Sequence, residues 1–263
     1  MYKESLDNGH IISVNNNLCV GCSQCIKDCP QNNIVLDDNK KAKIKSQDCM
    51  KCGHCMAICP QYAINISGYS EDPYDTESME LLDSEKLMNS LISRRSIRQF
   101  KSEKIEKEKI EKIIEAGRWT PTGKNAQDVS YIVIDKKKRL VEDLAIKIFK
   151  RLLRFLKVFN KSMRDMEIDE DFFFKKAPLA IMVIADSKVD GSLAASNMAL
   201  MAESLGIGVL YSGFFTVATS LSGKIKKELG IRSKKAVTTL VLGYPDVKYK
   251  RSTQREDAEI IYR

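Results

Sequence analysis

The sequence CVGCSQCIKDCP occupies residues 19–30, and CMKCGHCMAICP occupies residues 49–60. Both stretches follow the pattern C-x2-C-x2-C-x3-C-P, and together they hold all eight cysteines of the 263-residue chain. Each cysteine of the second stretch lies 30 residues after its counterpart in the first, so the two stretches are copies of one unit. Three thiolates at intervals of three residues can surround one face of an iron–sulfur cluster, and the loop between them offers backbone N–H groups to its sulfur atoms.

This doubled run is the ligand pattern of bacterial two-cluster ferredoxins, in which the fourth cysteine of each run ligates the other cluster. We therefore expect two 4Fe–4S clusters, named here cluster I and cluster II. The expected ligands of cluster I are Cys19, Cys22, Cys25 and Cys59. The expected ligands of cluster II are Cys49, Cys52, Cys55 and Cys29.

Two other uses of eight cysteines fit less well. A disulfide framework is typical of small secreted domains, but Met1 to His10 is polar and lacks the apolar segment of a signal peptide. A zinc site usually has two C-x2-C pairs rather than two triplets that each lead to C-P. Reduced cysteines and oxygen-sensitive clusters indicate a cytoplasmic protein.

Length and charge limit the remaining possibilities. The repeat uses about the first 70 residues, and the rest of the chain is long enough for a second domain. The formal charge is +8, and Lys136 to Arg164 alone holds 11 basic and two acidic residues. One basic helix face is not enough to indicate nucleic-acid binding. The longest apolar run, Ala177 to Ala185, has nine residues, far fewer than a membrane span needs.

The order of elements indicates two domains joined by a linker. We expect a ferredoxin domain over residues 1–70, an acidic linker over residues 71–83 and a second domain over residues 84–263. Short strands are expected in the first domain at Ile11–Val14, Ile34–Leu36, Ala42–Ile44 and Ile64–Ile66. The linker is predicted because residues 68–83 hold six acidic residues and neither Lys nor Arg.

Helices and strands alternate in the second domain, which predicts a sheet covered by helices. Expected helices begin at Ser84 with its hydroxyl as the N-cap, span Ile105–Ala116, Leu144–Met166 and Ser192–Leu205, and follow Tyr211 through Leu229. Expected strands are Tyr131–Ile134, Leu179–Ile184, Gly206–Tyr211 and Ala236–Leu242. The Leu144–Met166 helix is amphipathic, with Ile148, Phe149, Leu152, Leu156, Phe159, Met163 and Met166 on its apolar stripe. Its basic face is either solvated or a membrane or partner surface.

Several polar motifs follow one another in the second domain. The stretch RRSIRQF at residues 94–100 groups three guanidinium groups and a hydroxyl, which suit a phosphate and the polar edge of a ring. The stretch TPTGKNAQ at residues 120–127 leads into an expected strand, and SGF follows another at residues 212–214. In this order and spacing, the chain from about residue 85 resembles the nitroreductase family of FMN-dependent oxidoreductases, and as a whole it resembles the ferredoxin-fused members.

The resemblance implies a fold and a set of flavin contacts. The fold class is α+β, with a two-cluster ferredoxin-type domain followed by a nitroreductase-like sheet covered by helices. The FMN contacts that it implies are Arg94, Arg95 and Ser96 at the phosphate and ribityl chain, Arg98 near flavin N1 and O2, Asn125 at the pyrimidine edge, Ser212 and Gly213 near N5, and Lys250 and Arg251 closing on the phosphate. A cation near N1 favours the anionic reduced flavin.

Other features of the second domain bear on substrate and donor. Many family members continue N-x-Q-P-W, whereas here Gln127 is followed by Asp128 and Val129, so the aromatic residue is missing. The G-x-G-x-x-G dinucleotide fingerprint is absent as well, although family members bind NAD(P)H directly over the flavin. Flavin hydride transfer needs no protein nucleophile, so no catalytic residue is assigned. Trp119 and Phe172–Phe174 are expected in the core or, alternatively, on a substrate wall.

The expected protein is a cytoplasmic homodimer that buries FMN at its subunit interface. It would pass electrons between two clusters, FMN and an organic acceptor such as a nitroaromatic, a quinone or an activated alkene. NAD(P)H and a reduced ferredoxin or another redox protein are the candidate donors. The alternatives are a specialised dehalogenase or ene-reductase, an electron-transfer module for a protein partner, and a flavin-binding sensor without turnover.

Overall fold

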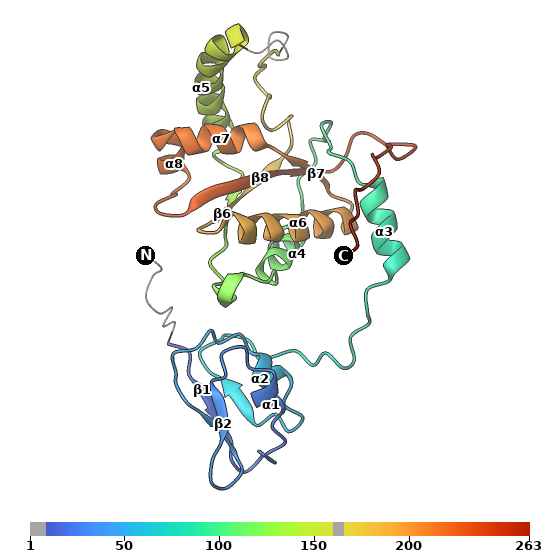
Figure 1. Cartoon of the computed structure of the whole chain (residues 1–263). Helices are drawn as coiled ribbons and strands as arrows, with labels where there is room; N and C mark the ends of the chain where they lie inside the picture. The colour runs from blue at the N-terminus through green and yellow to red at the C-terminus, as the bar shows by residue number, and fades with distance from the viewer. Residues whose placement is uncertain (1–8, 160–165) are drawn as a thin grey trace. The chain divides into compact units, whose positions relative to one another are not determined.

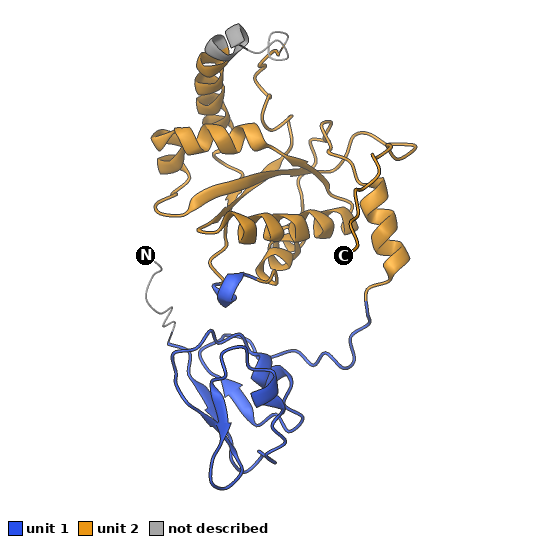
Figure 2. Ribbon diagram, in the orientation of Figure 1, with its two compact units in different colours: residues 1–81, 122–126 blue, residues 82–121, 127–263 orange. Residues whose placement is uncertain are grey.

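The computed structural model describes residues 9–159 and 166–263, with side chains left out at positions 154–159. It divides into two compact units (Figures 1 and 2). The N-terminal unit, blue in Figure 2, contains residues up to Leu81 together with 122–126, and the C-terminal unit, orange, contains residues 82–121 and 127–263. Each unit is described separately below.

The N-terminal unit consists of two small antiparallel sheets and two single-turn helices. Strand β1 pairs with β4, and β2 pairs with β3. The elements are β1 Ile12–Val14, α1 Gln24–Lys27, β2 Ile34–Leu36, β3 Ala42–Ile44, α2 His54–Ala57 and β4 Ile64–Ile66. The predicted bounds of β2, β3 and β4 are confirmed, and β1 begins one residue later than predicted.

The core of the N-terminal unit is partly made of thiols. Nine buried residues form it, and three of them are Cys19, Cys25 and Cys55. The other six are small or aliphatic residues, mostly from the strands: Ile12, Ile34, Ala42, Ala63, Ile64 and Ile66. The buried cysteines come from both cysteine runs, so the repeated segments supply part of this core.

The chain then continues without regular structure to α3, Ser84–Ser93. The prediction that Ser84 caps this helix is wrong. Asp83 is the N-cap, and its carboxylate accepts a hydrogen bond from Lys86 N–H at 2.7 Å. Asp is as good a cap as Ser and adds a negative charge at the positive end of the helix dipole.

One four-stranded antiparallel sheet forms the centre of the C-terminal unit, in the order β5-β6-β8-β7. The strands are β5 Ser130–Ile134, β6 Leu179–Ala185, β7 Gly208–Tyr211 and β8 Lys235–Gly243. Alternate residues of β6 enter different cores: Ala180 and Met182 face one, whereas Ile181 and Val183 face the other. The sheet is therefore covered by apolar packing on both faces.

Helices cover the two faces of this sheet (Figure 1). Helices α5 and α7 pack on one face with Phe173 and Phe174, and α4 and α6 pack on the other. The bounds are α4 Lys107–Arg118, α5 Lys138–Phe159, α6 Lys188–Ser204, α7 Gly213–Leu221 and α8 Gly223–Glu228, with a 3-10 turn η1 at Gly123–Asn125. The predicted α+β architecture of helices on a sheet is confirmed.

Several helix bounds differ from the predictions. The single helix expected after Tyr211 is two helices, because Ser222 adopts an extended conformation and its hydroxyl accepts from Ile225 N–H at 3.2 Å to begin α8. Helix α5 begins at Lys138 rather than Leu144, and Met166 lies outside it. Met163 and the side chains of Leu156 and Phe159 lie outside the described residues.

The aromatic residues divide between core and surface. Phe173 and Phe174 are buried as predicted, and Phe172 packs against them. Trp119 is 61% exposed, which corrects the expectation of a core position. It directly follows α4, and its indole N–H donates to Glu115 Oε1 of the preceding turn at 2.5 Å, so its polar edge is satisfied at the surface.

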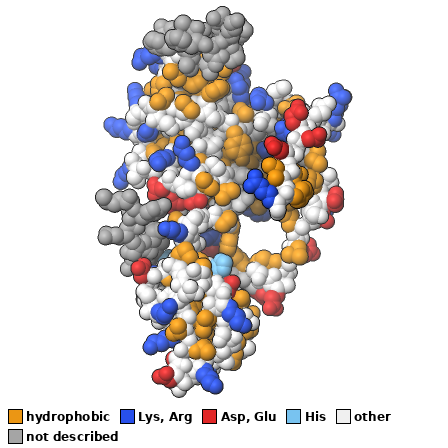
Figure 3. All heavy atoms as spheres, viewed as in Figure 1, with side chains coloured by type: hydrophobic (Ala, Val, Ile, Leu, Met, Phe, Trp, Pro, Cys, Tyr) orange, Lys and Arg blue, Asp and Glu red, His pale blue; other side chains and the backbone are white. Residues whose placement is uncertain are grey.

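The described part of α5 is amphipathic as predicted. Val141, Ala145 and Phe149 are buried, whereas Lys147 and Lys150 are exposed. Lys and Arg side chains are also spread over the surfaces of both units in Figure 3. In the described part of the chain, no helix combines the length and the apolar character that a membrane crossing requires.

Candidate functional site

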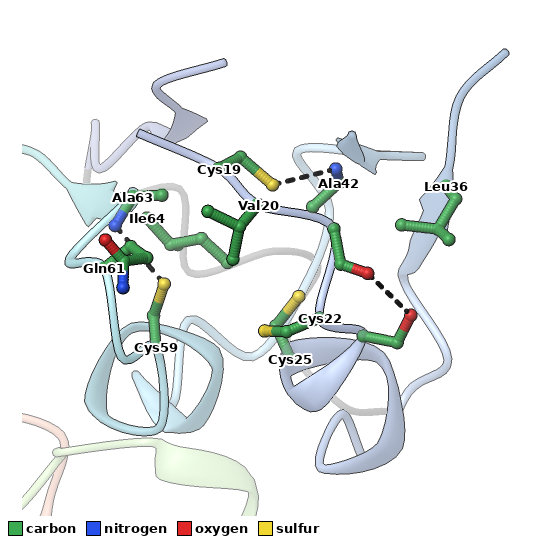
Figure 4. Close-up of a pocket in the computed structure, with 12 residues that line it drawn as sticks. Cys19, Val20, Cys22, Cys25, Leu36, Ala42, Cys59, Gln61, Ala63 and Ile64 are labelled. Carbon is green, nitrogen blue, oxygen red and sulfur yellow. Dashed lines mark hydrogen bonds between the residues drawn. The ribbon is translucent and has the colours of Figure 1, made fainter. Parts of the chain in front are cut away.

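The first candidate site is a pocket in the N-terminal unit (Figure 4). Cys19, Cys22, Cys25 and Cys59 line it. The remaining lining is mainly aliphatic, from Val20, Leu36, Ala42, Ala63 and Ile64. Among the described residues, no three His, Cys, Asp or Glu side chains converge on a position for a single metal ion. These four cysteines are the ligands predicted for cluster I, and an apolar pocket with four thiols has the chemistry that a 4Fe–4S cluster needs.

Burial raises the pKa of one thiol in each cysteine run. The pKa of Cys25 is raised mainly by burial and then by the charges of Cys22 and Cys59. Burial raises the pKa of Cys55 to about 11, with the charges of Cys52 and Cys29 acting in the same direction. The neighbours of each thiol include the fourth cysteine of the other run. Bound iron would supply the positive charge that buried thiolates need.

Backbone N–H groups point at three of the cysteine sulfurs. Asn33 N–H donates to Cys29 Sγ and Ala63 N–H donates to Cys59 Sγ, each at 3.3 Å. Ala42 N–H donates to Cys19 Sγ at 3.3 Å, and Figure 4 shows this bond. The first two donors lie four residues after their cysteines, so the 30-residue repeat reproduces them. N–H donors to the ligand sulfurs are a feature of iron–sulfur sites and tune their potentials.

Backbone geometry shapes the loop of the first run. Gly21 has φ +70°, and a Cβ there would collide with the carbonyl oxygen of Lys40. The second run has Lys51 at the equivalent position, also left-handed with φ 49°. A left-handed position favours glycine, so the first loop has both the conformational and the steric reason for it.

The second candidate site lies at the β7 edge of the sheet in the C-terminal unit. The segment 94–100, named here the arginine segment, runs beside β7. Ser96 bridges Val209 in parallel, and Ile97 N–H donates to Val209 O at 3.0 Å. Strand β7 leads directly into Ser212 and Gly213, so two of the predicted flavin-binding motifs share one edge of the sheet.

The arginine segment carries buried polar groups. Arg95 is half-buried, and its Nη2 atom is buried without a hydrogen-bond partner among the described residues. Its Nη1 donates to Arg94 O at 2.6 Å. Burial raises the pKa of Glu203 and of Tyr211, and the positive charge of Arg94 lowers each by a smaller amount. A buried guanidinium group with a free donor suits an anionic ligand such as a phosphate.

Ser212 and Gly213 stand at the start of α7, and their backbone N–H groups differ in whether they are already hydrogen-bonded. Ser212 N–H donates to Thr239 O at 2.8 Å, so its backbone donor is used inside the protein. The Ser212 side chain makes no capping hydrogen bond to the helix. Gly213 is exposed, and no hydrogen bond from its N–H to another described residue is formed. Of the predicted pair, Gly213 therefore supplies the available backbone N–H.

The other predicted flavin-contacting residues lie elsewhere. Arg98 is exposed, and its Nη1 donates to Ser96 O at 3.3 Å. Lys250 and Arg251 lie in the exposed segment that follows β8. Asn125 is grouped with the N-terminal unit, where its side-chain amide donates to Met50 O at 3.2 Å and Lys51 O at 3.1 Å. Their contacts with FMN remain predictions.

Two family models match the chain. Residues 91–244 match the model of the nitroreductase family, and residues 18–72 match that of the 4Fe-4S dicluster domain. The chain belongs to the nitroreductase family. The family match covers more than half of the chain, and the dicluster match covers both cysteine runs.

Three relatives illustrate the similarity of this nitroreductase-family chain to known proteins. A protein of Archaeoglobus fulgidus with NAD(P)H nitroreductase in its name is 28% identical over 61% of this chain and 86% of its own length. The FMN reductase [NAD(P)H] of Bacillus subtilis is 30% identical over 49% of this chain and 54% of its own. An FMN-bound nitroreductase structure from Bacteroides fragilis has a TM-score of 0.56 at 22% identity, covering 68% of this chain and 99% of that one.

Sequence reasoning missed several residues of the two candidate sites. Glu203 and Tyr211 lie in the electrostatic environment of Arg94, but they stand in an apolar helix and strand without any motif. The N–H donors of Ala42 and Ala63 carry no residue signature because every non-proline residue has such a group. The donors at Asn33 and Ala63 could have been found from the repeat, since both lie four positions after a cysteine.

Proposed function

We propose that this protein is an FMN-dependent oxidoreductase that passes electrons between two 4Fe–4S clusters, FMN and an organic acceptor. The observation that carries the flavin part is the arginine segment beside β7, in which Arg95 Nη2 is buried and has no hydrogen-bond partner among the described residues. The observation that carries the cluster part is the set of four cysteines around one apolar pocket. The names of the relatives, which include FMN reductase and NAD(P)H nitroreductase, support the same activity.

The residues at the β7 edge fit FMN. Arg94 and Arg95 would hold the phosphate by charge-assisted hydrogen bonds, with the Ser96 hydroxyl beside them. Gly213 N–H, at the positive end of α7, would donate to the ring, and Arg98 would stabilise negative charge on the reduced ring. Asn125, Ser212, Lys250 and Arg251 complete the proposed set. Bound FMN supplies hydride and single-electron chemistry, so the protein has to bind, orient and shield it.

The electron count explains why two clusters accompany one flavin. Each 4Fe–4S cluster carries one electron, whereas a full reduction of FMN takes two electrons. A nitro group accepts two electrons and two protons to give a nitroso group and water. Quinones and activated alkenes also take two electrons and two protons, and all three classes are proposed acceptors. The ferredoxin domain would therefore collect electrons singly and deliver them in pairs.

The proposed quaternary structure is a homodimer, which helix α3 supports. None of its residues is buried within one chain. Met88, Leu91 and Ile92 lie at helical spacing and are 52%, 45% and 51% exposed. Ile260 and Ile261 in the C-terminal segment are each 65% exposed. A second copy of the chain is the proposed cover for this apolar surface, because an apolar helical stripe is stable against another protein surface rather than water.

A second candidate function is an electron-transfer module that exchanges electrons with a protein partner. A complete pair of cluster sites favours it, because a flavin reductase fed only by NAD(P)H needs no clusters. A reduced ferredoxin is the proposed partner in that case. A specialised dehalogenase or ene-reductase is a narrower form of the first proposal. The proposed location is the cytoplasm, where thiols remain reduced.

Anaerobic stopped-flow reduction separates these functions. The holoprotein is mixed with NADH, NADPH or reduced ferredoxin, and bleaching of the clusters and of the flavin is followed separately, before and after adding a nitroaromatic or a quinone. The enzyme proposal expects reduced flavin that reoxidises with the small acceptor in repeated turnovers. Reoxidation by a partner protein alone would favour the electron-transfer module. Flavin that stays reduced with every acceptor would contradict both.

A further inference from the structure

We infer that the two clusters are unequal, with cluster I at the higher reduction potential, and that Lys41, Ala42 and Gln47 set the difference. This inference rests on the proposed binding of two clusters. The 30-residue repeat makes the two halves of the N-terminal unit directly comparable, since each residue of one half has a counterpart 30 positions away. Differences between counterparts around the cysteines therefore show where the two cluster environments diverge.

One pair of N–H donors is equal in the two halves. Asn33 N–H donates to Cys29 Sγ and its counterpart Ala63 N–H donates to Cys59 Sγ, both at 3.3 Å. By the crossed assignment, Cys29 belongs to cluster II and Cys59 to cluster I. Each cluster receives one such bond, so this pair does not distinguish them.

A second pair of donors is unequal. Ala42 N–H donates to Cys19 Sγ of cluster I at 3.3 Å (Figure 4). The counterparts are Ile12 and Cys49, but Ile12 N–H donates instead to Gln47 Oε1 at 3.1 Å. The Gln47 amide also donates back to Ile12 O at 3.0 Å, so the side chain is held on both sides of Ile12. Among the residues that the structure describes, none donates a hydrogen bond to Cys49 Sγ.

Lys41, which precedes Ala42, adds a positive charge near cluster I. The ammonium group of Lys41 donates to the carbonyl oxygen of Cys19. The counterpart of Lys41 is Ile11, which is 57% exposed and has no side-chain donor. Cluster I therefore has a cation against its loop at a position where cluster II has an aliphatic residue.

A third difference lies within the loops themselves. Met50 N–H, in the loop of cluster II, donates to Gln31 Oε1 at 2.6 Å. Its counterpart Val20 N–H has no hydrogen-bond acceptor in the described part of the chain and is free to face a bound cluster.

The differences at Ala42, Lys41 and Val20 act in one direction, and the lysine at position 51, where the first loop has Gly21, opposes them. Reduction adds negative charge to a cluster, so N–H donors to its sulfurs and a nearby cation each stabilise the reduced form and raise the potential. The N–H donors of Ala42 and Val20 and the ammonium group of Lys41 favour cluster I. Gln47 and Gln31 are positioning residues, because they act by withdrawing N–H groups from cluster II. In the protein with a single electron, that electron would reside mainly on the cluster held by Cys19, Cys22, Cys25 and Cys59.

An EPR-monitored redox titration of the anaerobic holoprotein tests the inference. The wild type should give two midpoint potentials. Gln47→Ala frees Ile12 N–H for Cys49 Sγ, so it should raise the lower potential and leave the higher one in place. One hydrogen bond changes the electron distribution between the clusters by about threefold to tenfold, which is about 30 to 60 mV for one electron. Gln47→Glu keeps the acceptor for Ile12 N–H and should not raise the lower potential.

A second pair of variants addresses the other cluster. Lys41→Met should lower the higher potential only, whereas Lys43→Met, an equal change of charge at an exposed position two residues further along the chain, should leave the separation between the two potentials unchanged. A Gln47→Ala shift in the higher potential, or in neither, would overturn the inference, as would two equal potentials in the wild type. Iron content well below about eight atoms per chain would instead contradict the proposed clusters themselves.

Discussion

Gly208 and Ile97 pack against each other so closely that no side chain fits at position 208. A Cβ atom there would lie 2.6 Å from Ile97 Cγ1 and 3.0 Å from Pro245 Cγ. Ile97 is buried, and its N–H donates to Val209 O. This contact fixes the arginine segment to the edge of the sheet, so the position of the residues proposed to bind the phosphate depends on a glycine outside that segment.

The first prediction is that Gly208→Ala weakens both the fold and flavin binding. The new methyl group has to displace Ile97, which costs about 1–3 kcal/mol of unfolding free energy, as overpacking usually does. FMN occupancy should fall with it. Thermal unfolding and bound flavin per chain are the measurements. Gly223→Ala is the matched control, because a Cβ there meets nothing within 4 Å. Equal behaviour of the two variants would contradict the prediction.

The second prediction concerns the charge at the proposed phosphate site. Arg94→Ala removes a charge-assisted hydrogen bond worth about 1.5–3 kcal/mol, so FMN affinity should fall roughly 10- to 150-fold. Quenching of flavin fluorescence on titration of the apoprotein gives the dissociation constant. Arg232→Ala removes an exposed arginine of the same unit and should leave the affinity unchanged. An unaltered constant for Arg94→Ala would mean that the arginine segment does not hold the phosphate.

The third prediction concerns ligand sharing between the two runs. Anaerobically purified protein should hold about eight iron atoms per chain, four for each cluster. Cys29→Ser should alter the EPR signal of cluster II and spare that of cluster I, although Cys29 follows the cluster I triplet in sequence. Cys59→Ser is the reciprocal control and should alter cluster I. Changes confined to the opposite cluster would refute crossed ligation, and stoichiometric zinc with little iron would refute the clusters.

The fourth prediction is a pH dependence that comes from Glu142. Burial raises the pKa of this carboxyl, although its Oε1 accepts from Phe173 N–H at 3.1 Å and Phe174 N–H at 2.9 Å. As the pH rises above 4.5, the unfolded state releases this proton before the folded state does, so unfolding becomes easier. Below that pH, both states keep the proton and Glu142 contributes no dependence.

The test of this dependence compares melting temperatures at pH 5 and pH 7.5. Glu142→Gln keeps an acceptor for the two N–H groups and removes the titration, so its melting temperature should fall less between the two pH values than that of the wild type. Glu108→Gln, at an exposed position of α4, should behave like the wild type. A wild-type melting temperature that changes with pH no more than the Glu142→Gln value would contradict the role of Glu142.

The fifth prediction concerns the exposed stripe of α3. Leu91→Glu places a charge within the proposed dimer contact, so it should shift the protein from dimer to monomer in light-scattering chromatography. Lys86→Glu, on the side of the same helix opposite this stripe, also changes charge and should leave the dimer intact. A wild-type monomer, or a Leu91→Glu dimer of equal strength, would contradict the proposed contact.

Sequence alone predicted most of the N-terminal unit because its repeat doubles every signal. The bounds of three strands were correct there, and the cysteines that line one pocket are those that the spacing groups together. Single-copy signals in the C-terminal unit were less reliable. Ser84 and Asp83 are adjacent and equally good caps, so pattern could not choose between them. The break between α7 and α8 arises from the extended backbone of Ser222, and the Ser222-Gly223 pair that marks it is a turn signal that the prediction of a single helix passed over.

Other features were not accessible from sequence for a physical reason. Trp119 is exposed because it follows the last turn of α4 and its indole N–H reaches Glu115, whereas hydrophobicity predicts burial. Ile12 N–H and Ala42 N–H donate to different kinds of acceptor, and the choice depends on which acceptor lies nearest to each N–H group. That choice is made by tertiary packing around Gln47, which a pattern of residue types does not contain.

The thiol-rich core of the N-terminal unit has a consequence for how the protein survives in air. Three of its nine buried core residues are cysteines, and the aliphatic remainder is too small to hold the unit together alone. With clusters bound, metal and sulfide occupy the centre of the fold, and a unit of this kind keeps its shape only while it keeps its metal. Oxygen therefore unfolds the unit by oxidising its clusters. The lifetime of the purified protein would be set by the rate of cluster oxidation rather than by its melting temperature.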